Sequence, residues 1–182
     1  MVRLCSSSQT RAKLLKSFHI DFIQSPVDFD EESIKEENPK SFVYRVVVGK
    51  LESAMKSYPL DIPLLVADTV IESSGRILRK AKSVDEAKEI LLAQSGKSVS
   101  IITAQALKRE NLLFIDISDT KYLFYEFDSA DLEAYLKSGE WAGKAGACMV
   151  EGFCKKYIKE VVGLESTAMG LSVEKIIPWM EL

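Results

Sequence analysis

The stretch Leu65-Val66-Ala67-Asp68-Thr69-Val70-Ile71 determines how the rest of this chain is interpreted. Its apolar residues are typical of a buried strand, and they lead to a single carboxylate, Asp68. Asp is depleted inside strands and avoids burial unless it has a partner, so Asp68 is either a turn residue bound to nearby backbone N–H groups or a working acid. A second short apolar run, Ile77-Leu78, ends in the cations Arg79-Lys80. The remainder of the chain must separate the two interpretations.

The composition is that of an ordinary soluble domain. The chain has 182 residues, of which 47% are hydrophobic and 28% charged, enough for one domain over residues 1–182 with a sizeable core. No apolar run approaches the roughly 20 residues that span a bilayer, and residues 1–5 lack the long apolar region of a signal peptide. We therefore expect a cytoplasmic protein without a membrane partner. The net charge of −3 does not indicate a nucleic-acid surface, although a local group of cations can still bind phosphates.

Cysteine and histidine usage narrows the chemistry. The cysteines Cys5, Cys148 and Cys154 have no CxxC spacing, so we interpret them as reduced thiols rather than zinc ligands. The single histidine, His19, leaves little basis for a histidine metal cluster or a Ser-His-Asp triad. General acid–base work must therefore fall to carboxylates or lysines.

Hydrophobic periodicity and capping signals predict a mixture of strands and helices. Residues 26–38 are expected to form an acidic connection, Ser73-Ser74-Gly75 indicates a hairpin turn, and Ser83 with Glu86 has the spacing of a capping box. Because strands and helices do not alternate strictly, the pattern favours an α/β fold with a mixed twisted sheet and flanking helices over a doubly wound parallel sheet. Strands are expected at 2–5, 20–24, 64–68, 70–72, 76–78, 99–107, 112–127 and 157–162, and helices at 9–18, 39–58, 83–94, 130–137 and 172–179.

The segment Ser6-Ser7-Ser8 before the first helix could bind phosphate, since a helix N-terminus offers free N–H groups and positive potential. Arg11 in the first turn opposes the helix dipole, and an anion shared with the helix end would give it a reason to be there. The plain alternative is that serine is an N-cap and Arg11 is solvated.

Three lysines also have two interpretations each. Lys50 lies among apolar helix residues and could snorkel from a half-buried face, and Lys80 could belong to a solvated cationic turn. Lys144 lies in Gly143-Lys144-Ala145-Gly146, a loop of small residues that could approach a ligand closely. Taken one at a time, none of the three indicates a site.

Taken together, these residues follow a distinctive order: Ser6 and Ser8 with Arg11, then Glu31, Lys50, Ala67-Asp68-Thr69, Lys80, Ser95-Gly96-Lys97, Lys144-Ala145-Gly146-Ala147, Glu151-Gly152 and Gly170-Leu171. Over nearly the whole chain this order resembles that of the Maf family of nucleoside triphosphate pyrophosphatases. The resemblance implies an elongated two-lobed fold, as in the Maf and inosine triphosphatase proteins, with the site in a central cleft. It also implies a homodimer.

The resemblance further implies metal-dependent hydrolysis of nucleoside triphosphates to nucleoside monophosphate and pyrophosphate, with non-canonical or modified nucleotides among the substrates. It makes Asp68 the proton acceptor, and Glu31 with Asp68 the ligands of Mg²⁺ or Mn²⁺, a cation held by few carboxylates plus phosphate oxygens and waters. The implied substrate contacts are Ser6, Ser8, Arg11, Lys50, Thr69, Lys80, Lys144 and Glu151.

The chain departs from the family pattern at its ends. Family members are similar in opening with S-x-S-P-R-R-x-E-L-L, where this chain has Gln9, Thr10 and Lys13, and Ser172 stands where the family has the proline of G-L-P. These changes are compatible with a nucleotide-binding regulator of septum formation that hydrolyses little. The retained Asp68 favours catalysis, because a regulator has no need of a water-activating carboxylate.

The preferred base is left open by a mixed signature. Glu151 replaces the glutamine that is typical of members acting on dTTP and UTP. Members of the 7-methyl-GTP type carry glutamate there, but they also have S-D-Q in place of Ala67-Asp68-Thr69.

Overall fold

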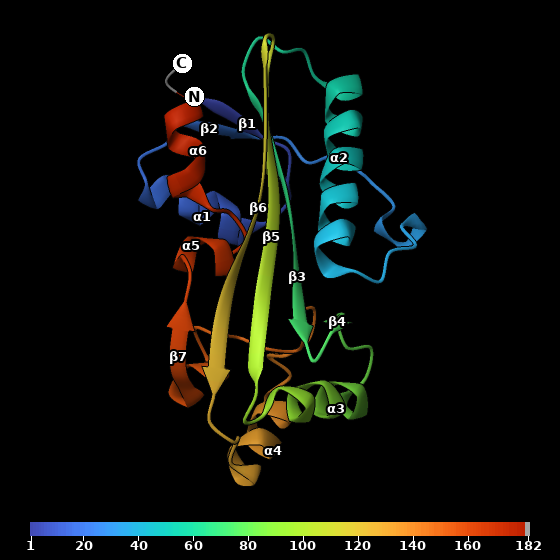
Figure 1. The fold of residues 1–182 in the computed structure, drawn as a ribbon, viewed down its shortest axis with the longest axis vertical. Coiled ribbons are helices and arrows are strands. Elements are labelled where there is room, and N and C mark those ends of the chain that lie inside the picture. The colour runs from blue at the N-terminus through green and yellow to red at the C-terminus, as the bar shows by residue number, and fades with distance from the viewer. Residues whose placement is uncertain (181–182) are drawn as a thin grey trace. The chain divides into compact units, whose positions relative to one another are not determined.

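A computed structural model describes residues 1–180 of the chain (Figure 1). Residues 181 and 182, which the predicted domain includes, lie outside the described part. The strands are β1 (Val2–Leu4), β2 (Phe22–Gln24), β3 (Leu64–Ser73), β4 (Arg76–Leu78), β5 (Ser98–Arg109), β6 (Leu112–Phe124) and β7 (Ile158–Val162). The α-helices are α1 (Gln9–Ser17), α2 (Pro39–Ser57), α3 (Val84–Gln94), α4 (Ser129–Ser138), α5 (Glu165–Ala168) and α6 (Val173–Met180), and the 3₁₀ helices are η1 (Glu31–Ser33) and η2 (Phe153–Tyr157).

The described strands form one seven-stranded sheet in the order β2-β1-β3-β5-β6-β7, with β4 paired to β3. Strand β1 is parallel to both β2 and β3, whereas β4 is antiparallel to β3 and β7 is antiparallel to β6. The predicted mixed sheet with flanking helices is therefore confirmed. The elongated two-lobed shape with a central cleft stays a prediction.

The chain forms two compact units. The first contains residues 1–69, 102–119 and 164–180, and the second contains 70–101 and 120–163. Strands β3, β5 and β6 each contribute residues to both units.

The core of the first unit lies between strands β1, β3 and β5 and helices α1 and α6. Figure 1 shows these two helices on one side of the strands and α2 on the other. The helix α2 begins at its N-cap Asn38, whose side chain accepts a hydrogen bond from the Ser41 backbone at 3.0 Å, with Pro39 in the first turn. The buried residues of the core are Val2, Leu4, Ala12, Leu14, Leu15, Leu65, Ala67, Leu107, Leu171, Val173 and Ile176.

Turn and cap chemistry shapes the second unit as the sequence predicts. Ser74 and Gly75 have φ of 53° and 78° in the turn between β3 and β4, and such positive angles suit a tight hairpin. The Ser83 hydroxyl accepts from the Glu86 backbone at 3.2 Å, and the Glu86 carboxylate accepts from the Lys82 backbone at 2.7 Å. The predicted cap at the start of α3 is confirmed, although its carboxylate reaches one residue further back than in a standard capping box.

The predicted end of a strand at Asp68 was wrong in an informative way. The strand expected to end at Asp68 continues to Ser73, so Asp68 lies inside β3 and not in a turn. The expected break rested on the low strand propensity of Asp, which is overridden here because Asp68 has an ion-pair partner and the strand goes on to pair with β4. The turn interpretation of Asp68 is thereby excluded.

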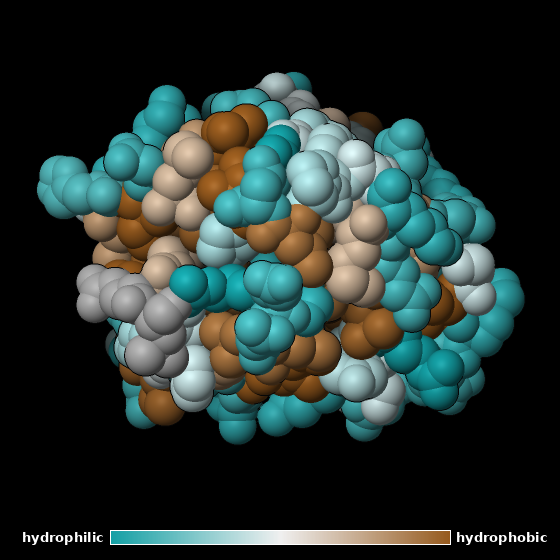
Figure 2. Space-filling view, turned by 90° about the horizontal axis from the view of Figure 1, so that it is seen from above, coloured by the Kyte–Doolittle hydropathy of each residue, from teal (hydrophilic) through white to brown (hydrophobic). Residues whose placement is uncertain are grey.

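The surface shows the usual mixture of residue types. In the face seen in Figure 2, hydrophobic areas form several patches separated by hydrophilic ones. Scattered exposed apolar side chains are normal for a folded protein. Within residues 1–180, no helix has the length and apolar character needed to cross a membrane.

Candidate functional site

The candidate site of the first unit is built around the middle of β3. Strand β1 ends at Leu4, which is paired with Leu65, and β3 continues past the end of β1 to Ser73. Successive side chains of a strand point to opposite faces. Accordingly Asp68 contacts Lys50 of α2, and Thr69 contacts Arg11 of α1.

One ammonium group joins two carboxylates. The Nζ of Lys50 donates to Oδ1 of Asp68 at 2.8 Å and to Oε1 of Glu31 at 2.5 Å. The Asp68 side chain is 9% exposed and that of Lys50 is 14%, whereas Glu31 is 47% exposed. A buried acid is thus linked through a partly buried cation to an acid at the surface, which explains how a carboxylate is tolerated inside an apolar strand.

Burial raises the pKa of the Asp68 carboxyl above its ordinary value. The ammonium of Lys50 opposes this rise, the Glu31 carboxylate adds to it, and the Arg11 guanidinium opposes it more weakly. The net direction is upward. A carboxylate with a raised pKa binds a proton more readily than an ordinary Asp, which is the property required of a general base.

We expect a Lys50→Met substitution to raise the pKa of Asp68 further, because both the charge of Lys50 and its hydrogen bond lower that pKa in the native protein. The measurement is the pH titration of the Asp68 carboxyl carbon by NMR. Lys56→Met, at an exposed lysine of the same helix, is the control and should leave the pKa of Asp68 unchanged. If the Asp68 carboxyl of the Lys50→Met protein titrated with the same pKa as in the native protein, the contact between Lys50 and Asp68 would be contradicted.

The segment that carries Glu31 is held against α2. Asp30 caps η1 by accepting from the Glu32 backbone at 3.0 Å, and Arg45 pairs with Glu36 at 2.6 Å. The ring of Phe29 lies so close to Gly49 that a Cβ at Gly49 would stand 2.1 Å from it. Gly49 therefore permits the close approach that positions the start of this segment.

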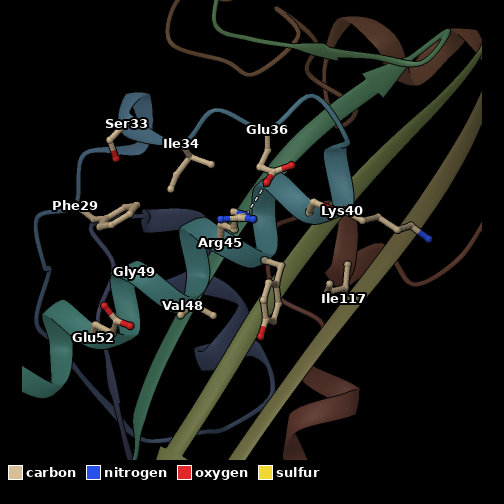
Figure 3. Close-up of a pocket in the computed structure, with 12 residues that line it drawn as sticks. Phe29, Ser33, Ile34, Glu36, Lys40, Arg45, Val48, Gly49, Glu52 and Ile117 are labelled. Atoms are coloured by element: carbon tan, nitrogen blue, oxygen red, sulfur yellow. Dashed lines mark ion pairs between the residues drawn. The ribbon is translucent and has the colours of Figure 1, made fainter.

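Figure 3 shows the same region, which lines a cavity of about 710 Å³, with Phe29 beside Gly49 and with the ion pair between Arg45 and Glu36. The residues that line the cavity come from the segment 29–36, from the exposed side of α2 and from Ile117 of β6. Arg11, Lys50 and Asp68 are not among them. The cavity and the candidate site therefore share supporting residues but are separate features.

A Gly49→Ala substitution should displace Phe29, and with it the segment around Glu31. Alanine favours a helix over glycine by about 1 kcal/mol, so we expect little loss of overall stability but faster hydrogen exchange of the backbone amides in residues 29–33. In a Phe29→Ala background the clash is absent, and the same substitution should stabilise the protein by about 1 kcal/mol. Unchanged exchange in the single variant would show that Phe29 does not position this segment.

The guanidinium of Arg11 is held on three sides. Its Nε donates to the Gly170 carbonyl at 2.7 Å, its Nη1 to the Ser6 hydroxyl at 3.0 Å and its Nη2 to the Thr69 hydroxyl at 3.2 Å. These bonds use three of the five N–H groups of a guanidinium, so within residues 1–180 one N–H on each Nη is available for a ligand. Burial lowers the pKa of Arg11, while Asp68 and Glu31 raise it, and an arginine stays protonated at neutral pH.

The two predicted serines have different local roles. Ser8 is the N-cap of α1, and its hydroxyl accepts from the Arg11 backbone at 3.3 Å. The Ser6 hydroxyl accepts from both the Ser8 backbone, at 3.2 Å, and the Arg11 side chain. The plain N-cap interpretation is therefore correct for Ser8, whereas a solvated Arg11 was the wrong alternative.

The structure brings together the predicted site residues of the first unit, namely Ser6, Ser8, Arg11, Glu31, Lys50, Asp68 and Thr69. The remaining three, Lys80, Lys144 and Glu151, are exposed residues of the second unit. Lys80 forms an isolated antiparallel bridge with Ala145, which places its backbone beside that of Lys144.

Sequence reasoning missed two buried polar residues that lie next to the partners of Arg11. Thr103 and Gln105 of β5 are fully buried, and both make hydrogen bonds to the segment 166–172. A signal was available, since two polar residues two positions apart inside an apolar strand require buried partners. The identity of those partners depends on tertiary structure.

The carboxylates of the site fit the needs of a divalent cation. Among residues 1–180, no group of three or more His, Cys, Asp or Glu side chains is arranged to hold a metal ion. Glu31 and Asp68 nevertheless converge on one cationic atom, the Nζ of Lys50. Mg²⁺ in phosphate-handling sites commonly takes only one or two carboxylates, with phosphate oxygens and waters completing the shell. Two converging carboxylates meet that requirement.

Two cations and two carboxylates thus lie around one strand, an arrangement that can bind an anion and supply an acid–base group. The chain belongs to the Maf family: residues 1–181 match the family described as Maf-like protein. The resemblance noted from the sequence is therefore confirmed.

Three similar relatives are each named nucleoside triphosphate pyrophosphatase. That of a Nitratiruptor species is 57% identical over 178 residues, covering 97% of this chain and 96% of the relative. That of Helicobacter pylori (strain J99 / ATCC 700824) is 39% identical over 98% of this chain and 94% of its own length. That of Campylobacter jejuni subsp. jejuni serotype O:23/36 (strain 81-176) is 37% identical over 97% of this chain and 98% of its own length.

Among solved structures, the Staphylococcus aureus Ham1 protein is similar to this chain with a TM-score of 0.47 and 15% sequence identity, over 68% of this chain and 71% of that one.

Proposed function

We propose that this protein hydrolyses nucleoside triphosphates to nucleoside monophosphate and pyrophosphate, as one functional domain over residues 1–182. The names of its relatives support this activity. The structural observation that carries the proposal is the ion-paired group Asp68–Lys50–Glu31 in the same unit as the fixed guanidinium of Arg11. It combines cations for phosphate oxygens with a base of raised pKa.

Hydrolysis of a phosphoanhydride requires neutralised phosphates and a positioned, activated water. Arg11 binds phosphate oxygens through its two remaining N–H groups, and Ser6 and Ser8 lie next to it at the N-terminus of α1. Lys50 contributes a second positive charge. Asp68 accepts the proton of the attacking water, for which its buried position suits it. Lys80, Lys144, Thr69 and Glu151 are proposed as further substrate contacts.

We further propose that the reaction depends on Mg²⁺ or Mn²⁺, held by Glu31 and Asp68 together with phosphate oxygens. Such an ion would neutralise charge on the phosphates and polarise the bond that breaks. Lys50 contacts both proposed ligands, so it would keep them oriented while the ion is absent.

The setting of the reaction is proposed as the cytoplasm, since nucleoside triphosphates are found there and three unpaired cysteines suit a reducing compartment. We propose a homodimer that has neither a nucleic-acid nor a membrane partner. Sedimentation that shows only monomer at micromolar concentration would remove the dimer.

The experiment that tests the function measures pyrophosphate release from a broad panel of canonical and modified nucleoside triphosphates, with Mg²⁺ or Mn²⁺ and with chelator. We expect release with the metals and little with chelator. If no triphosphate of the panel yields pyrophosphate with either metal, the proposal is wrong.

Substrate choice is tested at residue 151. An ionised glutamate only accepts hydrogen bonds, whereas glutamine also donates, and an unpaired buried polar group costs about 1–3 kcal/mol. We expect Glu151→Gln to shift relative kcat/KM toward pyrimidine triphosphates and away from guanine types by about tenfold. The measurement is the ratio of kcat/KM for UTP to that for 7-methyl-GTP in both proteins. An unchanged ratio, with both proteins active, would place Glu151 away from the base.

A further inference from the structure

We propose that Thr103 and Gln105 of β5 are positioning residues that fix the orientation of the Arg11 guanidinium toward phosphate. Neither residue belongs to the set predicted from the sequence. The inference rests on the proposed function for its kinetic consequence, but its structural part can be tested without any substrate.

The hydroxyls of Thr69 and Thr103 form a chain of hydrogen bonds that starts at Arg11. The groups at the two ends of this chain determine which hydroxyl donates to which. A guanidinium only donates and a carbonyl oxygen only accepts. Thr103 donates its single hydroxyl hydrogen to the Thr167 carbonyl at 2.8 Å. The hydroxyl of Thr69, 2.9 Å from that of Thr103, must therefore donate to Thr103 and accept from Arg11.

This chain of bonds, from Arg11 through Thr69 and Thr103 to the Thr167 carbonyl, uses each hydroxyl once as a donor and once as an acceptor. Thr103 is 0% exposed, so water cannot replace its hydroxyl without opening the structure. Removing that hydroxyl would leave Thr69 free to turn its hydrogen elsewhere. The contact of Thr69 with Nη2 of Arg11 would then lose its fixed orientation.

Gln105 supports Arg11 from a second side. Its Nε2 donates to the Ser172 carbonyl at 3.0 Å, and its Oε1 accepts from the Ser172 backbone N–H at 2.9 Å. This two-point contact fixes the segment that begins at Thr167, whose hydroxyl lies 2.7 Å from that of Ser172. The same segment presents the Gly170 carbonyl that binds Nε of Arg11.

Gly170 fits this arrangement through its backbone. Its φ is 98°, a conformation that favours glycine, and an added Cβ would stand 3.2 Å from the Thr69 hydroxyl and 3.4 Å from Nε of Arg11. The turn therefore lies directly against the guanidinium, and a shift of the turn moves the Nε contact.

The contact between Gln105 and Ser172 requires a backbone N–H at position 172. A proline there would have no N–H to donate, and the bond to Oε1 of Gln105 would be lost. Ser172 supplies that N–H, which is half of the two-point contact that holds the turn.

The two sets of hydrogen bonds begin on one strand. Thr103 and Gln105 are two positions apart and therefore share a face of β5. They reach Arg11 through its Nη2 and its Nε. A planar group held at two of its nitrogens cannot rotate in its own plane, which leaves its remaining N–H groups in one fixed direction.

The test compares Thr103→Val, which keeps the shape and removes the hydroxyl, with Thr103→Ser, which restores it. Thr120→Val is the matched control, because Thr120 of β6 is also 0% exposed. We expect Thr103→Val to lower kcat/KM about tenfold, mostly through KM, with recovery in Thr103→Ser and no change of KM in Thr120→Val. A Thr103→Val protein with lowered melting temperature but native KM would show that Thr103 is only structural.

A second measurement is independent of catalysis. The exchange of the Arg11 Nε–H proton with water, followed by NMR, should be faster in Thr103→Val and in Gln105→Met than in the native protein or the control. Unchanged exchange in both variants overturns the proposal even if the kinetics change. If the native protein releases no pyrophosphate, the proposed function fails, while this measurement still decides the positioning role; Gln105→Met decides it should Thr103→Val not fold.

Discussion

An Asp68→Asn protein is expected to keep its fold and to lose turnover by about 10²-fold or more, the usual scale for the loss of a general base. Asparagine has the same shape as aspartate but cannot accept a proton from water at neutral pH. Nucleotide binding should survive, because Arg11 and Lys50 remain.

The pH dependence adds a second readout to this variant. Because burial raises the pKa of Asp68, native activity should fall with decreasing pH at a less acidic pH than the ordinary aspartate value would give. The sign follows from the role: the base must be ionised, so activity is present above the raised pKa and is lost below it. The residual activity of Asp68→Asn should not show this loss of activity at decreasing pH.

The measurements are kcat as a function of pH and nucleotide affinity by calorimetry, for the native protein and for Asp68→Asn. Asp21→Asn, at an exposed aspartate, controls for the change of net charge. Near-native turnover in Asp68→Asn would mean that Asp68 serves only to hold Lys50.

The second large effect is expected at Arg11, where Arg11→Ala should reduce kcat/KM by about 10³-fold, the lower end of what an arginine contributes to phosphoryl transfer. The substitution removes a positive charge and leaves the Gly170 carbonyl and the Ser6 and Thr69 hydroxyls without their donor. Arg11→Lys separates the two contributions, since lysine keeps the charge but not the planar arrangement of donors.

We expect Arg11→Lys to remain well below native activity, because the fixed geometry is lost. The control is Lys13→Ala, which removes an exposed positive charge from the same helix. If Arg11→Lys were as active as the native protein, a positive charge alone would suffice, and the hydrogen bonds that surround Arg11 would serve stability only.

Local chemistry predicted much of the fold. The cap residues Ser8, Asn38 and Ser83 begin helices where the sequence indicated helix starts, because such side chains satisfy backbone N–H groups from within a few residues. The predicted end of the strand at Asp68 was wrong because its cause is not local. The strand continues past Asp68 because Lys50 of α2 pairs with that carboxylate, and the residues near Asp68 in the sequence do not reveal this partner.

The candidate site divides in the same way. The residues that would meet a ligand were predicted from their order along the chain. The residues behind them were not, because Thr103 is separated from Thr167 by 64 positions and Gln105 from Ser172 by 67. A buried threonine shows that a partner exists, but only the folded chain shows which one.

The ammonium shared by Glu31 and Asp68 has a consequence for how this protein can change over evolution. Replacing Lys50 alone would leave two acids facing each other, one of them buried, and replacing either acid alone would leave Lys50 with half of its counter-charge. Each single step is therefore costly, although a joint change need not be. We therefore expect substitutions at positions 31, 50 and 68 to occur together or not at all. Any descendant of this chain should either keep all three residues or have replaced them jointly.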